Sequence, residues 1–558
     1  MESHVRQVIL PLAALIIAVQ PATAQRAGVT NLPDSVLARI DKAFLAASGA
    51  EGPGCAIGLA RNGETVLTRA YGLANLEDGA ANTPETIFES GSVAKQFTAA
   101  SVILLALDGK LSLDDDIRKY LPEMHDFGKK ISIRNLLTHT SGLRDWYMLA
   151  DLEGAPAGRH VHSPASILEI ASRQRTLNFE PGAEYLYSNT GYILASVIVQ
   201  RVSGMPFAAF EKERIFKPLG MMHTEWREDF TKVVKGRATA YTGNARIGYT
   251  LDMPFTNVIG SGGLLTTVGD WLQWNAFLDN PAALPGGAAL VQSMTKQMVL
   301  NSGKQIPYAL GVSVTSREGM KEISHSGSTG GYRTWLARYP DAHASIAVMC
   351  NGGDGVNPTA LAQVALLAAL GRTATVAAAP VRVHVPVESL RRFDATFVGP
   401  TPEAIARFAV RDTMLVQVLP ATRPLIPVGE NRFRAGATEI AFVPRAAGVE
   451  RMLLISNGDT TVYTPAPASL PTRSALAAYA GVYAGNELSG RIAVMARDSV
   501  LVLKMGPTDS LVVQPTIRDT FAGPGGTVQF ARDGKGRVTS LGIWAGRVRN
   551  LRFTRLGR

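Results

Sequence analysis

The sequence predicts an α+β fold, in which an antiparallel sheet flanked by helices receives strands from both sides of a large helical insertion, followed by two small all-β halves. Three observations predict it. Strand-like apolar runs occur in an early pair, 55–60 and 65–71, and in a late pair, 332–339 and 344–350. Between them, from about residue 90 to 219, the apolar period is helical. Beyond residue 390 the runs are short and separated by Gly and Pro turns.

Each predicted element has a local cause. The early runs are joined by Asn62-Gly63, a pair that favours a tight hairpin because both residues tolerate positive φ. The late runs are separated by the turn 340–343, and an apolar helix is expected over about 359–370. Strands from both sides of the helical segment can then pair in one sheet.

We expect five segments along the 558 residues: a signal peptide (1–24), an α+β domain (25–372), a linker (373–390) and two β-rich domains (391–467 and 468–558). The β-rich domains are weakly repetitive. The pattern Phe393-x-x-x-Phe397-x-Gly399 recurs as Tyr479-x-x-x-Tyr483-x-Gly485. The repeat predicts either two small antiparallel barrels or one sandwich of two halves.

The first 24 residues have the pattern of an export signal. Arg6 precedes an apolar run over 8–19, and Ala22-Thr23-Ala24 suits signal peptidase. A run of this length is too short for a permanent transmembrane helix, which disfavours the alternative of an uncleaved anchor. No later segment reaches about 18 uninterrupted apolar residues. The sequence therefore predicts cleavage near Ala24 and a periplasmic or secreted protein without a stable membrane span.

Charge and cysteine content restrict the possible partners. The net charge is +10, but the basic residues are scattered, so we do not expect a nucleic-acid partner. Cys55 and Cys350 are the only cysteines, which is too few for a disulfide framework or a zinc site. They open and close two predicted core strands, so a cross-strand disulfide and two buried free thiols both fit, and two free thiols are the simpler interpretation. No metal or other cofactor is predicted.

The segment Ser92-Val93-Ala94-Lys95 has the S-x-x-K spacing, which places an amine beside a hydroxyl on one helix face. A desolvated lysine can take the proton of a serine nucleophile. With 32 serines and 15 lysines, chance alone predicts about one such motif. A second copy, Ser293–Lys296, lies between Gly- and Pro-rich turns and a polar stretch, where we expect it at the surface. Ser92 instead precedes a long apolar helix.

Two further motifs follow in order, Tyr187-Ser188-Asn189 and His325-Ser326-Gly327. The ordered set resembles the serine β-lactamase and penicillin-binding-protein-like hydrolase superfamily, and its class C β-lactamase-related, D-aminopeptidase-like branch in particular. The resemblance covers about residues 35–370 and implies a β-lactamase/transpeptidase-like fold with an acyl-enzyme mechanism.

By that resemblance, Ser92 attacks a carbonyl while Lys95 and Tyr187 share the proton transfer. Asn189 orients the substrate or the lysine. The resemblance further implies that the backbone N–H groups of Ser92 and Ser328 stabilise the oxyanion, with His325 and Gly327 in the same substrate-binding strand. Tyr187 can be the base only if lysine charge lowers its pKa far below its ordinary value near 10.

The third motif departs from the family pattern, because His325 stands where β-lactamases and DD-peptidases have the lysine of Lys-Thr-Gly. An imidazole is mostly neutral at pH 7, which argues against recognition of the penicillin carboxylate. It favours an esterase, an amidase or a D-aminopeptidase, and the D-aminopeptidase branch also carries two β-barrel domains after its hydrolase domain. His139 is expected to be a buried hydrogen-bonding residue outside the site.

The sequence thus predicts an exported serine hydrolase that acts on small amides or esters, with D-amino-acid peptides and cell-wall fragments as leading substrates. Two alternatives stay open. One is a slowly acylating penicillin-binding or sensor-type protein whose C-terminal β domains bind a ligand, and the other is a β-lactamase. The expected partner is a small-molecule or peptide substrate, and the oligomeric state is not predicted.

Overall fold

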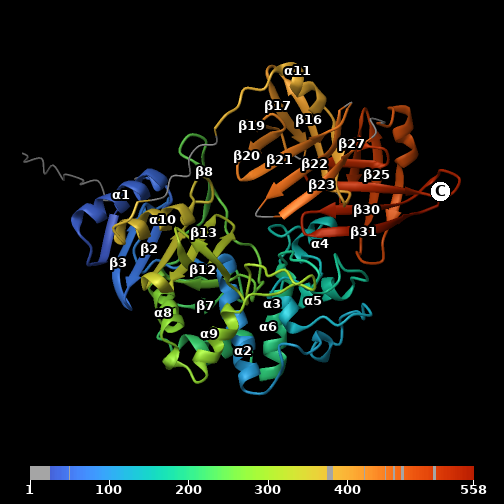
Figure 1. Cartoon of the computed structure of the whole chain (residues 1–558). Coiled ribbons are helices and arrows are strands. Elements are labelled where there is room, and N and C mark those ends of the chain that lie inside the picture. Colours follow the sequence, from blue (N-terminus) through green and yellow to red (C-terminus); the bar gives the residue numbers. More distant parts are fainter. Residues whose placement is uncertain are drawn as a thin grey trace, which may run out of the picture.

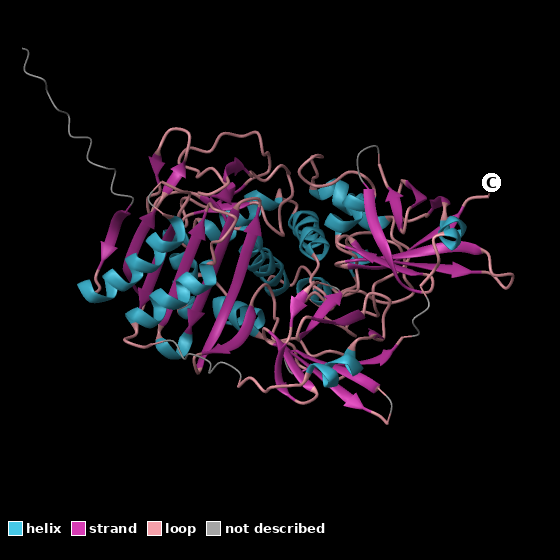
Figure 2. Cartoon of the chain, turned by 90° about the horizontal axis from the view of Figure 1, so that it is seen from above, coloured by secondary structure: helices cyan, strands magenta, loops and turns pink. Residues whose placement is uncertain are grey.

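A computed structural model describes residues 25–557 except 50, 374–380, 420, 447, 457–458, 467–469 and 507–509. The predicted signal peptide, residues 1–24, lies outside the described residues, as does the 374–380 part of the predicted linker. A sheet covered by helices forms one side of the molecule, and two β-rich units form the other (Figure 1; Figure 2).

The main sheet has seven strands in the order β1-β3-β2-β14-β13-β12-β11. Their bounds are β1 Gln25–Thr30, β2 Cys55–Arg61, β3 Glu64–Tyr71, β11 Ser313–Arg317, β12 Met320–Thr329, β13 Tyr332–Tyr339 and β14 Ala344–Cys350. Strand β2 pairs with β14 although almost 300 residues separate them, as the separation of 295 between Cys55 and Cys350 shows. The prediction of one antiparallel sheet built from both sides of a helical insertion is therefore confirmed.

The β2–β3 hairpin turns at the predicted dipeptide. Asn62 has φ +51° and Gly63 has φ +82°, so both central residues adopt the left-handed conformation that this type of turn requires. The register shifts by one residue between Leu59 and Ala60, and beyond this irregularity the pairing continues to Cys55 opposite Tyr71.

Helices cover both faces of the sheet. On one face α1 (Asp34–Ser48) packs against α10 (Pro358–Ala369), which lies on β14. On the other face α8 (Val268–Asp279) contacts β2 and β14, while α2 (Lys95–Leu107) packs against α6 (Asn189–Ser203). The remaining helices of this region are α3 Ile133–Leu137, α4 Trp146–Leu152, α5 Pro164–Ser172, α7 Phe207–Glu211 and α9 Gly287–Thr295.

Short strands connect the helical part to the sheet. Strands β6 (Phe88–Glu89), β10 (Leu264–Thr266) and β7 (Glu225–Trp226) form a three-stranded sheet, and β6 ends just before the Ser92 motif. Two small hairpins complete the region, and they consist of β4 Leu73–Asn75 with β5 Ala80–Ala81, and β8 Tyr241–Asn244 with β9 Gly248–Leu251.

The C-terminal part is all β, as predicted. After the short helix α11 (Val387–Leu390) comes a nine-stranded sheet whose edge strands, β18 and β19, are separated only by Leu425. Its strands are β15 Thr396–Val398, β16 Ile405–Arg411, β17 Met414–Leu419, β18 Arg423–Pro424, β19 Ile426–Gly429, β20 Arg432–Ala435, β21 Thr438–Pro444, β22 Val449–Ser456 and β23 Asp459–Pro465.

The last unit is a closed eight-stranded barrel. Its strands are β24 Gly481–Ala484, β25 Arg491–Arg497, β26 Val500–Lys504, β27 Ser510–Ile517, β28 Thr520–Gly523, β29 Gly526–Arg532, β30 Val538–Ala545 and β31 Val548–Arg555. Buried apolar side chains such as Leu503, Phe530 and Leu551 pack together in it. Eight strands give an interior just wide enough for such side chains.

This barrel shares a hydrophobic core with the helical part. Helices α4 and α5 lie beside the barrel strands (Figure 1). Their side chains, including Trp146 and Ile167, belong to the same apolar cluster as the barrel residues. Beside them Arg144, whose side chain is 1% exposed, donates to Glu487 over 2.6 Å. A buried ion pair survives only with good geometry and further hydrogen bonds, and Arg144 also donates to the backbone oxygens of Arg549 and Asn550.

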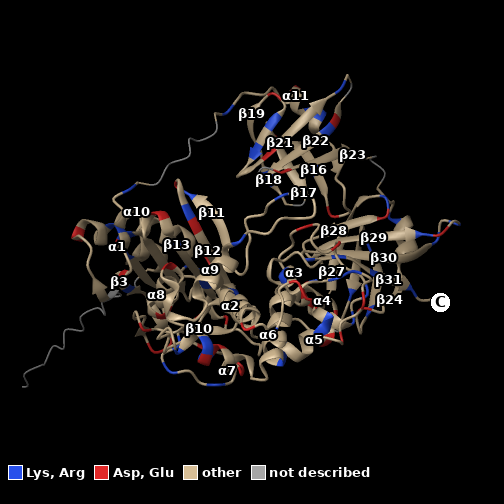
Figure 3. Cartoon of the chain, turned by 60° about the horizontal axis from the view of Figure 1, so that its bottom comes forward, with Lys and Arg blue, Asp and Glu red and all other residues tan. Residues whose placement is uncertain are grey.

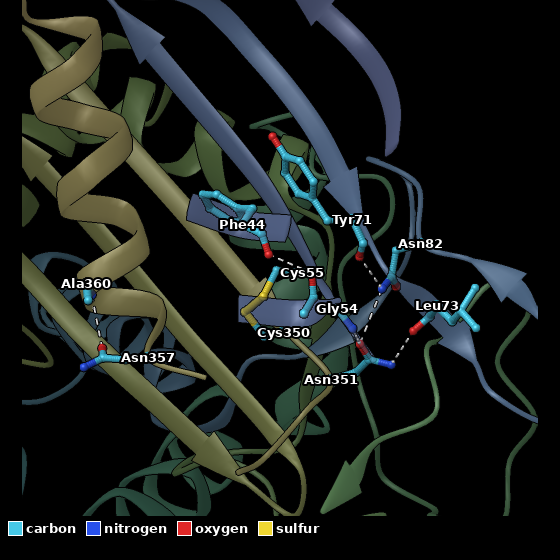
Figure 4. Close-up of a disulfide and its surroundings, with 11 residues drawn as sticks. Phe44, Gly54, Cys55, Tyr71, Leu73, Asn82, Cys350, Asn351, Asn357 and Ala360 are labelled. Atoms are coloured by element: carbon cyan, nitrogen blue, oxygen red, sulfur yellow. Dashed lines mark hydrogen bonds between the residues drawn. A yellow bond between two sulfur atoms is a disulfide. The ribbon is translucent and has the colours of Figure 1, made fainter. Parts of the chain in front are cut away.

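Cys55 and Cys350 form a disulfide, so the preferred interpretation of two free thiols was wrong. The two residues are directly opposite each other in the β2–β14 register, which the sequence alone did not specify. Both are buried. The adjacent Asn351 side chain accepts from the Gly54 N–H at 2.8 Å and donates to the Leu73 oxygen at 3.0 Å (Figure 4).

Lys and Arg are interspersed with Asp and Glu across the described chain (Figure 3). Within that part of the chain, no single helix has the length and apolarity to cross a membrane. One strongly bent pair, Asn189–Ser203 with Phe207–Phe216, meets the length and composition requirement only when its two helices are taken together.

Candidate active site

The Ser92 turn is pressed against strand β12. A short 3₁₀ segment, Gly91–Ala94, leads into α2, and Gly91 has φ +52°. A Cβ atom at Gly91 would lie 2.5 Å from the Ser328 nitrogen, so only glycine permits this approach. Ser92 consequently lies in the first turn of helical structure, where backbone N–H groups are free of intrahelical partners.

Lys95 is fully buried directly behind Ser92. Its Nζ lies 3.1 Å from Ser92 Oγ, 2.8 Å from Asn189 Oδ1 and 2.7 Å from the Ser261 backbone oxygen. Burial lowers the pKa of Lys95 well below its ordinary value. Once neutral, the amine has two N–H groups for the two pure acceptors, and its lone pair is left facing the Ser92 hydroxyl.

Tyr187 is the third member of the cluster. The centroid of its ring lies 4.9 Å from Lys95 Nζ, and its hydroxyl oxygen is buried without a hydrogen-bond partner among the described residues. Burial raises the pKa of Tyr187, with the Ser92 side chain and Arg547 opposing the rise. The condition for a tyrosinate base is therefore not met, because a buried neutral lysine supplies no charge to lower the phenol's pKa.

Asn189 and its neighbour Asp145 hold Lys95 in place. The Asn189 N–H, at the start of α6, donates to Asp145 Oδ2 at 2.7 Å, and Asp145 Oδ1 accepts from the Tyr147 N–H at 3.1 Å. Asp145 thus caps α4 and fixes the residue whose side-chain oxygen contacts Lys95. Asp145 was not predicted, although an Asp immediately before a helix is a recognisable N-cap signal.

His325 is uncharged and held from both sides. Its Nδ1 lies 2.6 Å from the Ser326 backbone oxygen and its Nε2 lies 2.9 Å from the Tyr308 hydroxyl. Burial lowers the pKa of His325 to about 4. A neutral ring that donates from Nδ1 and accepts at Nε2 satisfies both contacts. His325 therefore presents no cation to a substrate near neutral pH.

Gly327 and Ser328 continue β12 beside Ser92. A Cβ atom at Gly327 would lie 2.0 Å from the Ser90 oxygen, so the absence of a side chain allows the strand and the Ser92 turn to touch. This contact places the Ser92 and Ser328 backbone N–H groups in one region. Such an arrangement is suited to an oxyanion between the two donors.

His139 lies beside the cluster, although it was predicted to lie outside the site. It is buried, as expected, and its Nδ1 accepts from the Ser188 N–H at 3.1 Å. Its ring also lies against that of Tyr187, with centroids 4.1 Å apart, so it supports the tyrosine directly. The second S-x-x-K copy, Ser293–Lys296, starts in α9 and ends at an exposed lysine, and the structure does not bring it to this cluster.

The cluster opens into a cavity of about 1050 Å³. Ser92, Tyr187, Asn189, His325, Gly327 and Ser328 all line it, and Lys95 lies behind them. Apolar lining comes from Trp146, Tyr147, Met148, Met253 and Phe255. The barrel contributes Gly546 and Arg547 from the β30–β31 turn. Arg547 carries no sequence signal, because it reaches the site only through the docking of the barrel.

Comparison with known proteins places this geometry in a family. Residues 40–370, more than half of the chain, match the beta-lactamase family. The chain belongs to the beta-lactamase family. The residues around Ser92 and Lys95 lie within the matched part of the chain, whereas Arg547 comes from the C-terminal barrel.

Within this family, similar curated proteins are D-aminopeptidases. One from Gluconobacter oxydans is 30% identical over 344 residues, which are 61% of this chain and 63% of that protein. Another, from Brucella anthropi, is 30% identical over 314 residues, 56% of this chain and 58% of that protein. The match thus spans less than two thirds of either relative.

Solved structures agree on the fold. The octameric penicillin-binding protein homologue from Pyrococcus abyssi is similar over 77% of this chain and all of its own, with a TM-score of 0.56 and 23% sequence identity. At this identity the likeness establishes the fold of the beta-lactamase family and nothing further.

Proposed function

We propose that this chain is a serine hydrolase that forms an acyl-enzyme on Ser92 and cleaves small amides or esters. The observation that carries the proposal is the set of contacts at Lys95 Nζ. The Asn189 side-chain oxygen and the Ser261 backbone oxygen accept its N–H groups. The remaining position on the nitrogen therefore faces the Ser92 hydroxyl, 3.1 Å away. Burial lowers the pKa of Lys95 well below its ordinary value, which favours the neutral amine that can accept a proton.

The acylation step follows from this arrangement. Ser92 Oγ bonds to the substrate carbonyl carbon as its proton passes to the Lys95 lone pair, and the carbonyl electron pair moves onto oxygen. The N–H groups of Ser92 and Ser328 stabilise that oxyanion, and one such donor is worth roughly 10²–10³-fold in rate. Because the donors are fixed by the contact between the Ser92 turn and β12, they need no rearrangement during the reaction.

Tyr187 acts as a protonated phenol in the next step. The bond to the leaving nitrogen breaks and its electron pair departs with nitrogen. Nitrogen takes the Tyr187 proton, and Tyr187 takes the proton held by Lys95. A water molecule then attacks the ester carbon and gives a proton to Lys95. The bond from that carbon to Ser92 Oγ breaks, and Oγ takes the proton from Lys95, which releases the acid and restores the Ser92 hydroxyl. A neutral phenol suits this relay, because burial raises the pKa of Tyr187.

We propose D-amino-acid amides and peptides, including cell-wall fragments, as the substrate class. The D-aminopeptidase relatives support it. The neutral His325 also supports it, since a lysine at this position would suit a β-lactam carboxylate. The apolar residues Trp146, Met148 and Phe255 offer a surface for a hydrophobic side chain.

We also propose that the protein is exported to the periplasm or secreted, with cleavage near Ala24. The Cys55–Cys350 disulfide supports an oxidising compartment. A fusion of residues 1–24 to a reporter that is active only after export tests this proposal. Retention of the reporter in the cytoplasm would contradict it.

A hydrolysis panel on the full mature chain tests the reaction. It compares p-nitrophenyl esters, D- and L-amino-acid p-nitroanilides and a chromogenic cephalosporin, with Ser92→Ala as the inactive control and Ser293→Ala as the matched serine control. We expect turnover of D-amino-acid anilides that is lost only in Ser92→Ala. Strong cephalosporin turnover would instead favour a β-lactamase, and stoichiometric labelling of Ser92 without turnover would favour a slowly acylating sensor.

A further inference from the structure

Arg547 reaches the hydrolase centre from the last hairpin of the barrel. Its backbone oxygen accepts from Asn178 Nδ2 at 2.9 Å, and the Arg549 N–H donates to Asn178 Oδ1 at 2.7 Å. The Asp145 N–H also points to the Arg547 oxygen, at 3.5 Å. Both polar atoms of the Asn178 side chain therefore hold the β30–β31 turn on the hydrolase region.

The Arg547 side chain lies over the reacting groups. Its guanidinium carbon is 4.6 Å from the centroid of the Tyr187 ring, within the range of a cation–π interaction. Its Nη1 lies 3.6 Å from Asp145 Oδ2, the same oxygen that accepts from the Asn189 N–H. The carboxylate of Asp145 is 1% exposed, so a nearby cation offsets much of the cost of burying it.

We propose that Arg547 is a positioning residue of the hydrolase centre, which holds the Asp145–Asn189 contact behind Lys95 and seats the Tyr187 ring beside Ser92. The inference rests on the proposed function. It makes the C-terminal barrel part of the catalytic apparatus, because the arginine comes from the barrel while every group it acts on comes from the hydrolase region.

The charged groups around Lys95 determine how removal of Arg547 changes the pKa of Lys95. The titratable and charged groups that face Lys95 are His139, Asp145, Tyr187, Tyr192, His325 and Arg547. Burial lowers the pKa of Lys95 most, Asp145 opposes this, and Arg547 lowers the pKa further. Burial raises the pKa of Asp145, and the Asn189 N–H, Arg547 and the Tyr147 N–H oppose that rise. Removal of Arg547 therefore raises the pKa of Lys95 and keeps more of the amine protonated at a given pH.

The test is the pH dependence of Ser92 labelling by a fluorophosphonate, measured with the full mature chain from about pH 5 to 10. The variants are Arg547→Gln, the conservative Arg547→Lys, and Arg537→Gln as an exposed arginine control from another turn of the same barrel. The thermal midpoint of each variant verifies that it is folded. If Arg547→Gln does not fold, Arg547→Lys still tests the proposal, because it keeps the positive charge and its profile should stay at that of the wild type.

We expect Arg547→Gln to move the acid limb upward by about 0.5–1 pH unit and to slow labelling about three- to tenfold below that limb. Arg547→Lys and Arg537→Gln should stay within about twofold of the wild type at every pH. An Arg547→Gln profile that superimposes on the wild type, or falls by one constant factor at every pH, would overturn the proposal. So would an Arg547→Lys profile as displaced as that of Arg547→Gln.

Two further outcomes distinguish this inference from a substrate-binding role of Arg547 and from failure of the proposed function. If Arg547→Gln weakens only the hydrolysis of substrates that carry a carboxylate and leaves labelling unchanged, Arg547 binds substrate and the positioning role is wrong. If wild type and Ser92→Ala are equally unlabelled, the proposed function fails and this inference fails with it. Labelled wild type with an unchanged Arg547→Gln profile contradicts the inference alone.

Discussion

Lys95→Met tests the central assignment, because methionine has similar length and no lone pair of comparable basicity. The change removes the proton acceptor 3.1 Å from Ser92 Oγ. Loss of a positioned general base costs about 10²–10⁴-fold in rate, which is about 3–5 kcal/mol of activation free energy. We therefore expect Ser92 labelling by a fluorophosphonate to slow by that factor.

The same substitution should cost less in stability than in rate. It leaves Asn189 Oδ1 and the Ser261 oxygen without their donor, at about 1–3 kcal/mol each. It also removes the penalty of burying an amine, which offsets part of that cost. We expect the free energy of unfolding, from chemical denaturation, to fall by at most about 2 kcal/mol. Labelling within tenfold of the wild type would refute the role of Lys95 as base.

Four other predictions concern the scaffold. Arg144→Met should lower the unfolding free energy by about 3–5 kcal/mol, because Glu487 stays buried without its cation; a change below about 1 kcal/mol in denaturant titration would contradict this. Cys350→Ala should lower the unfolding free energy by about 2–4 kcal/mol. A wild-type denaturation midpoint that is equal with and without reductant would show that the disulfide is not formed. The fragment 25–372 should aggregate, since truncation bares the apolar face of α4 and α5; a monodisperse fragment on size exclusion would refute the shared core. Burial raises the pKa of Glu211 to about 8, above its unfolded value near 4.5, so its stabilising contribution is complete below pH 4.5 and is lost towards pH 8. Glu211→Gln should accordingly be more stable than the wild type at pH 9 but not at pH 4.5, and equal pH dependence of the two proteins would contradict that.

Local patterns predicted the parts of the fold whose causes are local. Asn62-Gly63 specified a turn because both residues tolerate positive φ, and the spacing of Ser92 and Lys95 required only that a helix begin there. The order of the three motifs then predicted a shared site, and the structure brings Tyr187 and His325 to the same cavity.

What the sequence could not predict depends on register and docking. The disulfide needs Cys55 and Cys350 to be exact partners across β2 and β14, and a shift of one residue would have turned them to opposite faces. The contact of Arg547 with Tyr187 needs the barrel to dock on α4 and α5 in one orientation. Neither condition leaves a periodic pattern in the sequence.

The electrostatics of the site give a reason for that docking. A lysine that serves as a base must lose its proton near neutral pH, and burial with neutral acceptors at Asn189 and Ser261 favours that loss. Asp145 is needed to fix Asn189, yet its carboxylate pulls in the opposite direction by favouring the ammonium form. A cation beside Asp145 resolves the conflict, since it offsets the carboxylate's effect on the amine while leaving its hydrogen bonds intact. Arg547 lies in that position, which is why we regard the barrel as part of the proposed active site and not as an appended domain.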